Sequence, residues 1–345
     1  MNGKMVVGDR RRASGSYGGG VVRNRLWMFG AVLALVAAGC GAQRSSSSDG
    51  GSAAGGGGGG DCGELTINEQ SWVGSTANVY VAKNLLENEL GCTVSITKIA
   101  EIPVFEAMAD GKVDVILEDW QHTNLYKKYA EEQKTVKQAG SLGVVGHIGW
   151  YVPKYLVDEN PELATWQGVA ENSELFQTAE SGDKGQFLSG DPSYVTNDES
   201  LISTLDLNFK VIYAGGEASE IAAIQQAYAQ EEPLLFYWYE PQWLNAALDF
   251  VEVKLPKRTE GCDADPDKVS CAYPDYDLRK LVSTEFAESG SPAVQFVENF
   301  KWSNADQELV SELIAEEKMT PEDAAAQWLS DNKDKADVWL EGISS

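Results

Sequence analysis

From residue 64 onward, hydrophobic positions follow first a two-residue spacing and then a helical spacing. In "ELTINEQ", apolar Leu65 and Ile67 alternate with polar neighbours, which is typical of a strand. The next segment, "STANVYVAKNLLENELG", has apolar residues on one helical face, and Gly91 stands where a helix would end. "TVSITKI" is the following predicted strand. This strand–helix–strand unit predicts two parallel strands joined by a right-handed crossover.

The same alternation continues through the middle of the chain. Further strands are predicted over "VDVILE", "GVVGHIGWYVP", "GQFLSG", "FKVIYA", "PLLFYW" and "ALDFVEVKLP", and helices over "PVFEAMADG", "NDESLISTL" and "EASEIAAIQQAYAQ". The segment "GVVGHIGWYVP" is long enough to leave one lobe and enter another. We therefore predict an α/β fold with two lobes: a discontinuous first lobe from residues 64–150 and 242–345, and an inserted second lobe from residues 151–241.

The last third of the chain has mainly helical spacing. The predicted helices are "SPAVQFVENF", "NADQELVSELIAEEK" and "TPEDAAAQWLSDNKDKADVWL". Asn304 is the predicted cap of the second of these helices. Thr320 caps the third, with Pro321 at its first helical position.

The N-terminus has the composition of a secretory signal. Basic residues precede the apolar run "LWMFGAVLALVAAG", which ends at Cys40. The small residues before Cys40 resemble a bacterial lipobox, in which the cysteine becomes the lipid-modified first residue; the alternative is a free cysteine after an ordinary signal. We therefore predict a signal peptide over residues 1–39 and a lipidated Cys40 with a Gly/Ser linker over residues 40–63, holding the protein at the outer face of the cell membrane.

Charge and cysteine content narrow the function further. The chain has 53 acidic and 27 basic residues and a net charge of −26, which argues against nucleic acid as a partner. An even number of cysteines beyond Cys40 in an exported protein predicts disulfides. Two of these cysteines directly precede the first two predicted strands, which begin at the same sheet edge, and the other two bracket one loop. The predicted pairs are Cys62–Cys92 and Cys262–Cys271.

Aromatic residues stand at the ends of five predicted strands. In open α/β sheets, ligands bind outside the carboxyl ends of the strands. A cleft walled by aromatic faces suits a trimethylammonium group, because its charge is spread over methyls that donate no conventional hydrogen bonds. Taken singly, each ring is as readily a core residue. The predicted cage residues are Trp72, Trp120, Trp150, Tyr194 and Tyr239.

Three motifs, "EDWQHTNLY", "GDPSYVTND" and "FYWYEPQW", resemble the glycine betaine/choline/proline-betaine substrate-binding proteins of ABC importers. The resemblance extends from about Leu65 to Leu340 and implies a two-lobe, type II periplasmic-binding-protein fold with the ligand in the cleft. It also implies that Trp120, Tyr194 and Tyr239 match cage rings of the family.

Trp72 is similar to a cage tryptophan of choline-type members, which carry an acidic residue shortly after it. Here that stretch reads "WVGS", which favours glycine betaine. The resemblance implies that Val195 and Thr196 bind the ligand carboxylate with main-chain N–H groups, since the predicted helix "NDESLISTL" begins there. Asn124 lies where some relatives place a carboxylate-binding histidine, and His122 is close by.

The predicted protein is a monomeric solute-binding lipoprotein for osmoprotection, without metal, cofactor or catalytic residues, serving a permease and its ATPase subunits. Choline or carnitine are alternative ligands. A surface-anchored carbohydrate-active enzyme or an adhesion module is a different class of alternative. The two histidines, His122 and His147, and the absence of a G-x-S-x-G motif or P-loop disfavour an enzyme. We interpret His147 as a core histidine, and one member of the adjacent pair Glu118–Asp119 as a support of the cage or of a domain contact.

Overall fold

The structure is a computed structural model that describes residues 62–343. The predicted signal peptide, the lipidation site Cys40 and nearly all of the linker lie outside the described residues. Within residues 62–343, no helix is both long and apolar enough to span a membrane.

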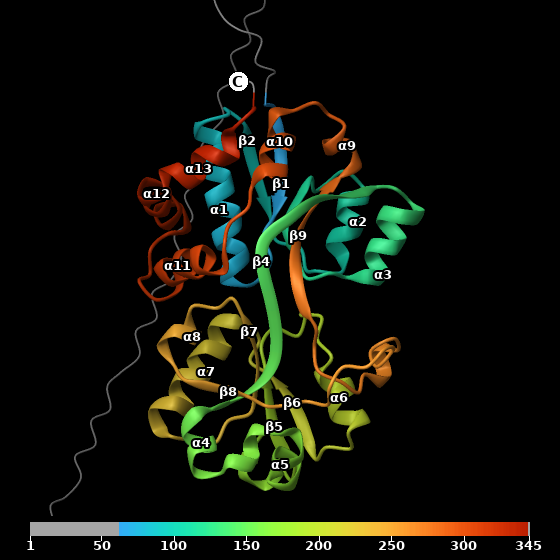
Figure 1. Ribbon diagram of the computed structural model, residues 1–345, viewed down its shortest axis with the longest axis vertical. Coiled ribbons are helices and arrows are strands. Elements are labelled where there is room, and N and C mark those ends of the chain that lie inside the picture. Colours follow the sequence, from blue (N-terminus) through green and yellow to red (C-terminus); the bar gives the residue numbers. More distant parts are fainter. Residues whose placement is uncertain (1–61, 344–345) are drawn as a thin grey trace, which may run out of the picture. The chain divides into compact units, whose positions relative to one another are not determined.

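Nine strands of the described residues form one sheet in the order β2-β1-β3-β9-β4-β7-β5-β6, with β8 paired to β4 (Figure 1). The strands are β1 (Glu64–Asn68), β2 (Thr93–Thr97), β3 (Val115–Asp119), β4 (Val136–Pro153), β5 (Gly185–Ser189), β6 (Phe209–Tyr213), β7 (Phe236–Glu240), β8 (Phe250–Glu252) and β9 (Asp275–Ser283). The mixture of parallel and antiparallel pairs confirms the predicted α/β class.

Helices pack on both groups of strands. Those of the first lobe are α1 (Val73–Asn88), α2 (Pro103–Ala109), α3 (Thr123–Tyr126), α9 (Thr284–Ala287), α10 (Pro292–Asn299), α11 (Asn304–Ala315), α12 (Pro321–Asp331) and α13 (Lys333–Leu340). Those of the second lobe are α4 (Lys154–Glu159), α5 (Trp166–Glu171), α6 (Asp198–Thr204), α7 (Glu217–Gln230) and α8 (Leu244–Ala247).

Two long strands connect the lobes. In Figure 1, β4 and β9 run between the first lobe, which carries α1 and α10–α13, and the second lobe, which carries α4–α8. The first part of β4 pairs with β9, from Val136 opposite Ser283 to His147 opposite Asp275. Its last part pairs with β7 and β8. One continuous strand therefore belongs to both lobes.

The chain returns to the first lobe later than residue 242. Val253 donates its backbone N–H to the carbonyl of Trp150 at 2.8 Å, and Tyr273 donates its hydroxyl to Asp198 at 2.8 Å. Leu244, Val253, Val269 and Tyr273 are all buried among second-lobe residues. Strand β9 makes the second crossing, because after residue 242 the chain first pairs with a first-lobe strand where β9 meets β3, with Leu281 opposite Ile116.

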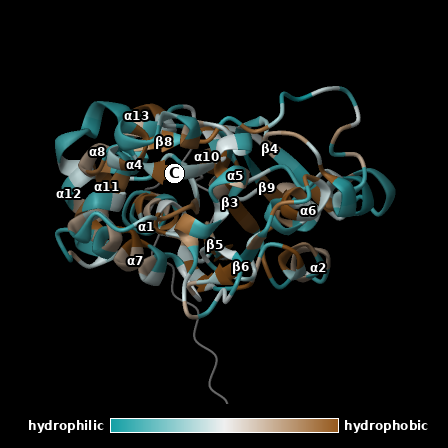
Figure 2. Ribbon diagram, turned by 90° about the horizontal axis from the view of Figure 1, so that it is seen from below, coloured by the Kyte–Doolittle hydropathy of each residue, from teal (hydrophilic) through white to brown (hydrophobic). Residues whose placement is uncertain are grey.

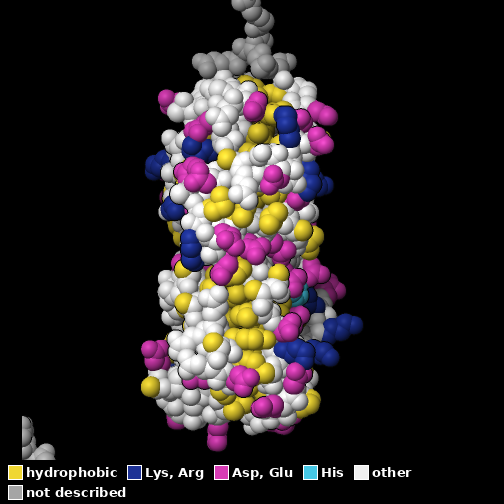
Figure 3. Space-filling view, turned by 90° about the vertical axis from the view of Figure 1, so that its left-hand side faces the viewer, with side chains coloured by type: hydrophobic (Ala, Val, Ile, Leu, Met, Phe, Trp, Pro, Cys, Tyr) yellow, Lys and Arg dark blue, Asp and Glu magenta, His cyan; other side chains and the backbone are white. Residues whose placement is uncertain are grey.

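Separate apolar cores stabilise the lobes. Figure 2 shows hydrophobic segments concentrated around β3 and β5 in the interior, with hydrophilic segments at the periphery. In the first lobe, Trp302 packs edge-on against Trp328, and Trp328 stacks on Trp339 at a centroid distance of 5.8 Å. In the second lobe, Phe187 and Leu201 belong to the central cluster. Acidic side chains spread over the face seen in Figure 3, in keeping with the net negative charge.

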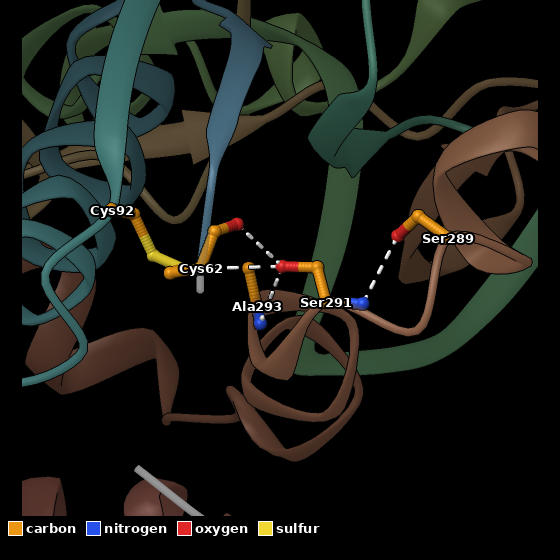
Figure 4. Close-up of a disulfide and its surroundings, with 5 residues drawn as sticks. All are labelled: Cys62, Cys92, Ser289, Ser291 and Ala293. Carbon is orange, nitrogen blue, oxygen red and sulfur yellow. Dashed lines mark hydrogen bonds between the residues drawn. A yellow bond between two sulfur atoms is a disulfide. The ribbon is translucent and has the colours of Figure 1, made fainter. Parts of the chain in front are cut away.

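The strand–helix–strand unit at the start of the first lobe forms as predicted. Strands β1 and β2 are parallel, with Glu64 opposite Thr93. Cys62 and Cys92 precede these strands at one sheet edge and form a disulfide with a Cα–Cα distance of 4.8 Å (Figure 4). Ser291 donates its hydroxyl to the Cys62 carbonyl at 2.8 Å, which ties this edge to α10. The second predicted disulfide, Cys262–Cys271, is also present.

The C-terminal helices begin differently from prediction in one case. Ser303, not Asn304, caps α11: its hydroxyl accepts from the backbone N–H of Asp306, and the Asp306 carboxylate accepts from the N–H of Ser303. This reciprocal pair satisfies two N–H groups at once. Asn304 instead binds the backbone of Val145 through both its oxygen and its nitrogen. Thr320 caps α12 with Pro321 as its first residue, as predicted.

Candidate ligand-binding site

A pocket lies where the two lobes meet, and residues of both lobes line it. The first lobe contributes two tryptophans and one carboxylate, and the second lobe contributes three tyrosines. The lining residues are Trp72, Glu101, Trp120, Ile148, Tyr194, Val195, Tyr237 and Tyr239.

The ends of parallel strands bring the rings together. Trp72 lies just beyond β1, and Trp120 directly follows β3. Across the pocket, Trp72 lies edge-to-face with Tyr194 at a centroid distance of 5.9 Å. Trp120 lies edge-to-face with Tyr239 at the same distance. The rings therefore meet at the sheet edge where α/β folds bind ligands.

Strand β7 sorts its aromatic run between pocket and core. Side chains of a strand alternate between the two faces. Tyr237 and Tyr239 point toward the pocket, and their ring centroids are 6.2 Å apart. Phe236 and Trp238 point the other way into an apolar cluster. Tyr237 was not among the predicted cage residues, although its two-residue spacing from Tyr239 could have identified it.

Trp150 does not line the pocket. It lies inside β4, which continues to Pro153, so it is not at a strand end. Its ring is fully buried and packs on Phe187 at a centroid distance of 4.7 Å. Its indole N–H donates to Asp198 at 2.7 Å. Ile148, two residues earlier on the same face of β4, reaches the pocket instead.

A buried carboxylate holds both pocket tryptophans. Oε1 of Glu118 accepts the indole N–H of Trp72 at 2.7 Å and that of Trp120 at 2.9 Å. Its other oxygen accepts from the amides of Asn78 at 2.5 Å and Gln307 at 3.0 Å. Burial raises the pKa of Glu118 to about 7, against the opposing effect of these hydrogen bonds. Glu118 thus supports the rings, as predicted for one of the acidic pair.

The other member of the pair holds a histidine. Asp119 contacts Nδ1 of His122 at 2.9 Å, and Glu101 lies 3.4 Å from Nε2. Burial by itself lowers the pKa of His122, but its hydrogen bonds to Asp119 and Glu101 raise it to about 10. His122 is therefore protonated at neutral pH. Its side chain is engaged by two carboxylates of its own lobe.

Glu101 also reaches the second lobe. Its Oε2 accepts the backbone N–H of Val195 at 3.0 Å. This N–H is one of the donors that the family resemblance assigned to a ligand carboxylate. Glu101 was not among the predicted site residues, although it follows the end of β2 as Trp72 follows the end of β1.

The remaining residues predicted to bind a carboxylate lie differently. Thr196 precedes α6, and Asn197 occupies the N-cap position without a capping side-chain bond. The backbone N–H of Asn197 donates to the hydroxyl of Tyr273 at 2.5 Å. Asn124 is exposed, and together with His122 it borders a wider opening beside the pocket rather than the pocket itself.

A second interlobe contact involves Glu217 at the start of α7. One of its oxygens accepts the backbone N–H of Val73 at 2.8 Å, at the first residue of α1. The other accepts from the Tyr239 hydroxyl and from the Gln242 amide. A helix N-terminus favours a negative charge, so this carboxylate joins the first helix of one lobe to the pocket wall of the other. No sequence motif indicated this contact.

His147 is not a core residue. It lies half-buried in β4, where Asp275 of β9 contacts Nδ1 at 2.7 Å and Glu252 of β8 contacts Nε2 at 3.0 Å. The hydrogen bond to Glu252 is the main cause that raises its pKa to about 9, with Asp275 adding to it. The interpretation of His147 as a core histidine was wrong. Although β4 is central in the sheet, some of its side chains between the two lobes are only partly covered, and that of His147 is one of them.

Solved structures with this fold define the class of protein. The chain is similar to an ABC-transporter choline binding protein in complex with choline, at 18% identity and a TM-score of 0.67, over 82% of this chain and 93% of that one. It is also similar to lactococcal OpuAC in its closed-liganded conformation complexed with glycine betaine, at 18% identity and a TM-score of 0.62, over 81% and 99%. The fold is therefore that of two-lobe, type II periplasmic binding proteins.

The sequence places the chain within one family of that class. It belongs to the family of substrate binding domains of ABC-type glycine betaine transport systems, whose sequence profile matches residues 63–331. It is also 24% identical to the trimethylamine N-oxide-binding protein of Pelagibacter ubique (strain HTCC1062), over 80% of this chain and 89% of that protein. The protein is thus an extracytoplasmic substrate-binding component of an ABC importer for solutes of the glycine betaine and choline type.

Proposed function

We propose that this protein binds a trimethylammonium solute in an aromatic cage and delivers it to a membrane permease with its ATPase subunits. The cage consists of Trp72, Trp120, Tyr194 and Tyr239, with Tyr237 as a fifth ring. Lipidation at Cys40 would hold the monomeric protein at the outer membrane face. Import of such a solute would serve osmoprotection.

The single observation that supports this proposal best is the composition of the pocket wall. Five of the eight lining residues are Trp or Tyr, and none is basic. Ring faces attract a diffuse cation by about 0.5–2 kcal/mol each in a desolvated site. The indole N–H groups of Trp72 and Trp120 donate to Glu118, so their electron-rich faces, rather than their donors, remain for a ligand.

Glycine betaine is the ligand that we propose first, because the family description names it and because "WVGS" carries no acidic residue after Trp72. One structural observation favours choline as a second candidate. Glu101 presents a carboxylate at the pocket wall and occupies the N–H of Val195. A betaine carboxylate would have to displace it, whereas a choline hydroxyl would donate to it.

Calorimetric titration tests the proposed function. The ligands are glycine betaine, choline, proline betaine, carnitine and trimethylamine N-oxide. At least one should bind with micromolar or tighter affinity, corresponding to about −8 kcal/mol or better. If choline binds as tightly as glycine betaine, we would infer that Glu101 binds the polar end of the ligand. Binding of none of these compounds would refute the proposed function.

A further inference from the structure

We infer that Glu118 is the counter-charge of the bound cation, acting through the two tryptophans that separate it from the ligand. This inference rests on the proposed function, because it concerns how the same cage recognises a positive charge. Glu118 touches Trp72 and Trp120 by their indole nitrogens and stays behind the rings, so it is a positioning residue rather than a ligand contact.

The surroundings of Glu118 satisfy its hydrogen bonds without neutralising its charge. Its side chain is 2% exposed, and its four donors come from Trp72, Trp120, Asn78 and Gln307, all of them neutral. Among the described residues, no ion pair involves Glu118. A buried carboxylate in this state lacks a positive partner, and such charges are costly unless one is provided.

A positive partner for Glu118 could lie in the pocket, on the other side of the Trp72 and Trp120 rings. An N–H donated to a carboxylate polarises the donor group, which enriches the indole face in negative charge. Both pocket tryptophans donate to the same oxygen of Glu118, so both faces are enriched together. A cation in the cage would therefore interact with two rings and with the Glu118 carboxylate behind them, in addition to Glu101 in the pocket wall, whose charge is shared with His122. A neutral ligand of equal shape would gain the packing alone.

The charged neighbour of Glu118 is Glu217, which faces it from the second lobe and raises its pKa further. Burial raises the pKa of Glu217 as well. The negative charges of Glu118 and Glu217 repel each other, so the ionisation of one carboxyl disfavours the ionisation of the other. A cation in the cage favours the ionised form of Glu118, whose pKa is raised to about 7, so binding near pH 6.5 should release protons.

The effect of the ligand's positive charge can be measured by comparing two ligands that differ in charge but not in shape. Choline and 3,3-dimethylbutan-1-ol have nearly the same shape, but a neutral carbon replaces the ammonium nitrogen in the latter. In Glu118→Gln, the affinity for choline should fall roughly tenfold while the affinity for the alcohol changes by less than about twofold, as expected for a removed charge at this range. Glu118→Asp, which keeps the charge, should retain the preference for choline. Glu312→Gln, with the same charge change on the exposed side of α11, should change neither affinity.

The chain can accommodate the amide at position 118. In the described residues, Oε1 of Gln307 has no hydrogen-bond partner, so this amide can turn to accept from it, while Asn78 keeps its bond to the Gly74 carbonyl. Should Glu118→Gln nevertheless fail to fold, calorimetry of the wild-type protein in two buffers at pH 6.5 decides. Proton release with choline but not with the alcohol supports a carboxyl counter-charge.

The outcomes separate the two proposals. If the wild-type protein binds none of the trimethylammonium compounds, the proposed function fails. If it binds choline but Glu118→Gln lowers both affinities equally, Glu118 is only a structural support and the inference is wrong. Absence of proton release in the wild-type protein would also overturn it.

Discussion

The indole nitrogens of Trp72 and Trp120 are turned away from the pocket by one carboxylate, and this fixes which part of each ring a ligand meets. Tyr239 is held in a similar way, since its hydroxyl donates to Glu217. The N–H and O–H groups of these three aromatic residues are thus already hydrogen-bonded to buried carboxylates of the protein. At these three rings the pocket therefore offers π faces, which discriminate by charge and shape, and hydrogen bonding to a ligand is left to other lining residues such as Glu101.

Removing one ring should weaken binding without unfolding the protein. For Trp120→Ala and for Tyr239→Ala we expect a loss of about 1–2 kcal/mol in ligand affinity, the value of one cation–π face in a desolvated site. Calorimetry with glycine betaine and choline measures this. Tyr213→Ala, at an exposed tyrosine outside the pocket, is the control and should bind normally. An unchanged affinity in either pocket variant would remove that ring from the cage.

At the scale of elements, closure of the pocket depends on contacts between residues of different lobes at helix starts or in the loops just before them. Glu217 begins α7 in the second lobe and binds the first N–H of α1 in the first lobe. Glu101 makes the reciprocal contact, from the first lobe to Val195 of the second. Both use a carboxylate that accepts a backbone N–H, so they fix the distance between the lobes without requiring a particular side chain on the other side.

Loss of the Glu217 contact should favour separation of the lobes. In Glu217→Ala, the first N–H of α1 loses its buried acceptor, which costs about 1–3 kcal/mol. We expect ligand affinity to fall by about tenfold or more and the radius of gyration of the liganded protein to increase in small-angle X-ray scattering. Gln225→Ala, on the exposed side of α7, should behave as the wild type. Unchanged scattering and affinity would show that Glu217 does not hold the lobes.

For the whole molecule, buried carboxyl groups set the response to pH. Burial raises the pKa of Glu118 to about 7 and that of Asp198 to about 6. Glu220 is completely buried, and both of its oxygens lack a hydrogen-bond partner in the described part of the chain. Burial and the nearby Glu217 raise its pKa well above the usual value. These groups are more easily protonated in the folded than in the unfolded protein.

The ligand-free protein should therefore be more stable at pH 5.5 than at pH 7.5. A carboxyl group with a raised folded pKa contributes stability that is fully present below its unfolded pKa and is lost as the pH rises through the folded pKa. His122 and His147, whose pKa values are raised to about 10 and about 9, act in the same sense. Lys280, with its pKa lowered by burial to about 7, opposes them mainly above that pH.

Thermal unfolding measures this difference. Between these two pH values, the raised pKa of Glu118 alone corresponds to a difference in stability on the order of 2 kcal/mol, or roughly 4–8 °C in melting temperature. Glu118→Gln should show a smaller difference between the two pH values. A wild-type melting temperature that is higher at pH 7.5 would contradict the assignment of these carboxyls as buried and protonated at low pH.

The sequence did not predict β9, and it joined α12 and α13 into one helix. It did by itself determine the other strands, the longer helices, the α/β class and the strand ends that carry Trp72, Trp120 and Tyr239. These features follow from local spacing, because a hydrophobic period selects strand or helix and the chain direction then fixes which end of a parallel strand faces the site. Both disulfides followed from the same reasoning, since their cysteines lie beside strands or within one loop.

Only the tertiary structure decided what stands around those rings. Glu118 and Gln307 are 189 residues apart in the chain, and Glu217 meets Val73 across 144 residues. No periodicity encodes such pairs, because they arise only when the two lobes and the C-terminal helices pack together. Packing on Phe187 of β5 likewise places Trp150 in the core of the second lobe rather than in the pocket. The sequence thus determines which rings lie at the strand ends, whereas packing between distant segments determines that the carboxylates of Glu118 and Glu217 lie behind those rings.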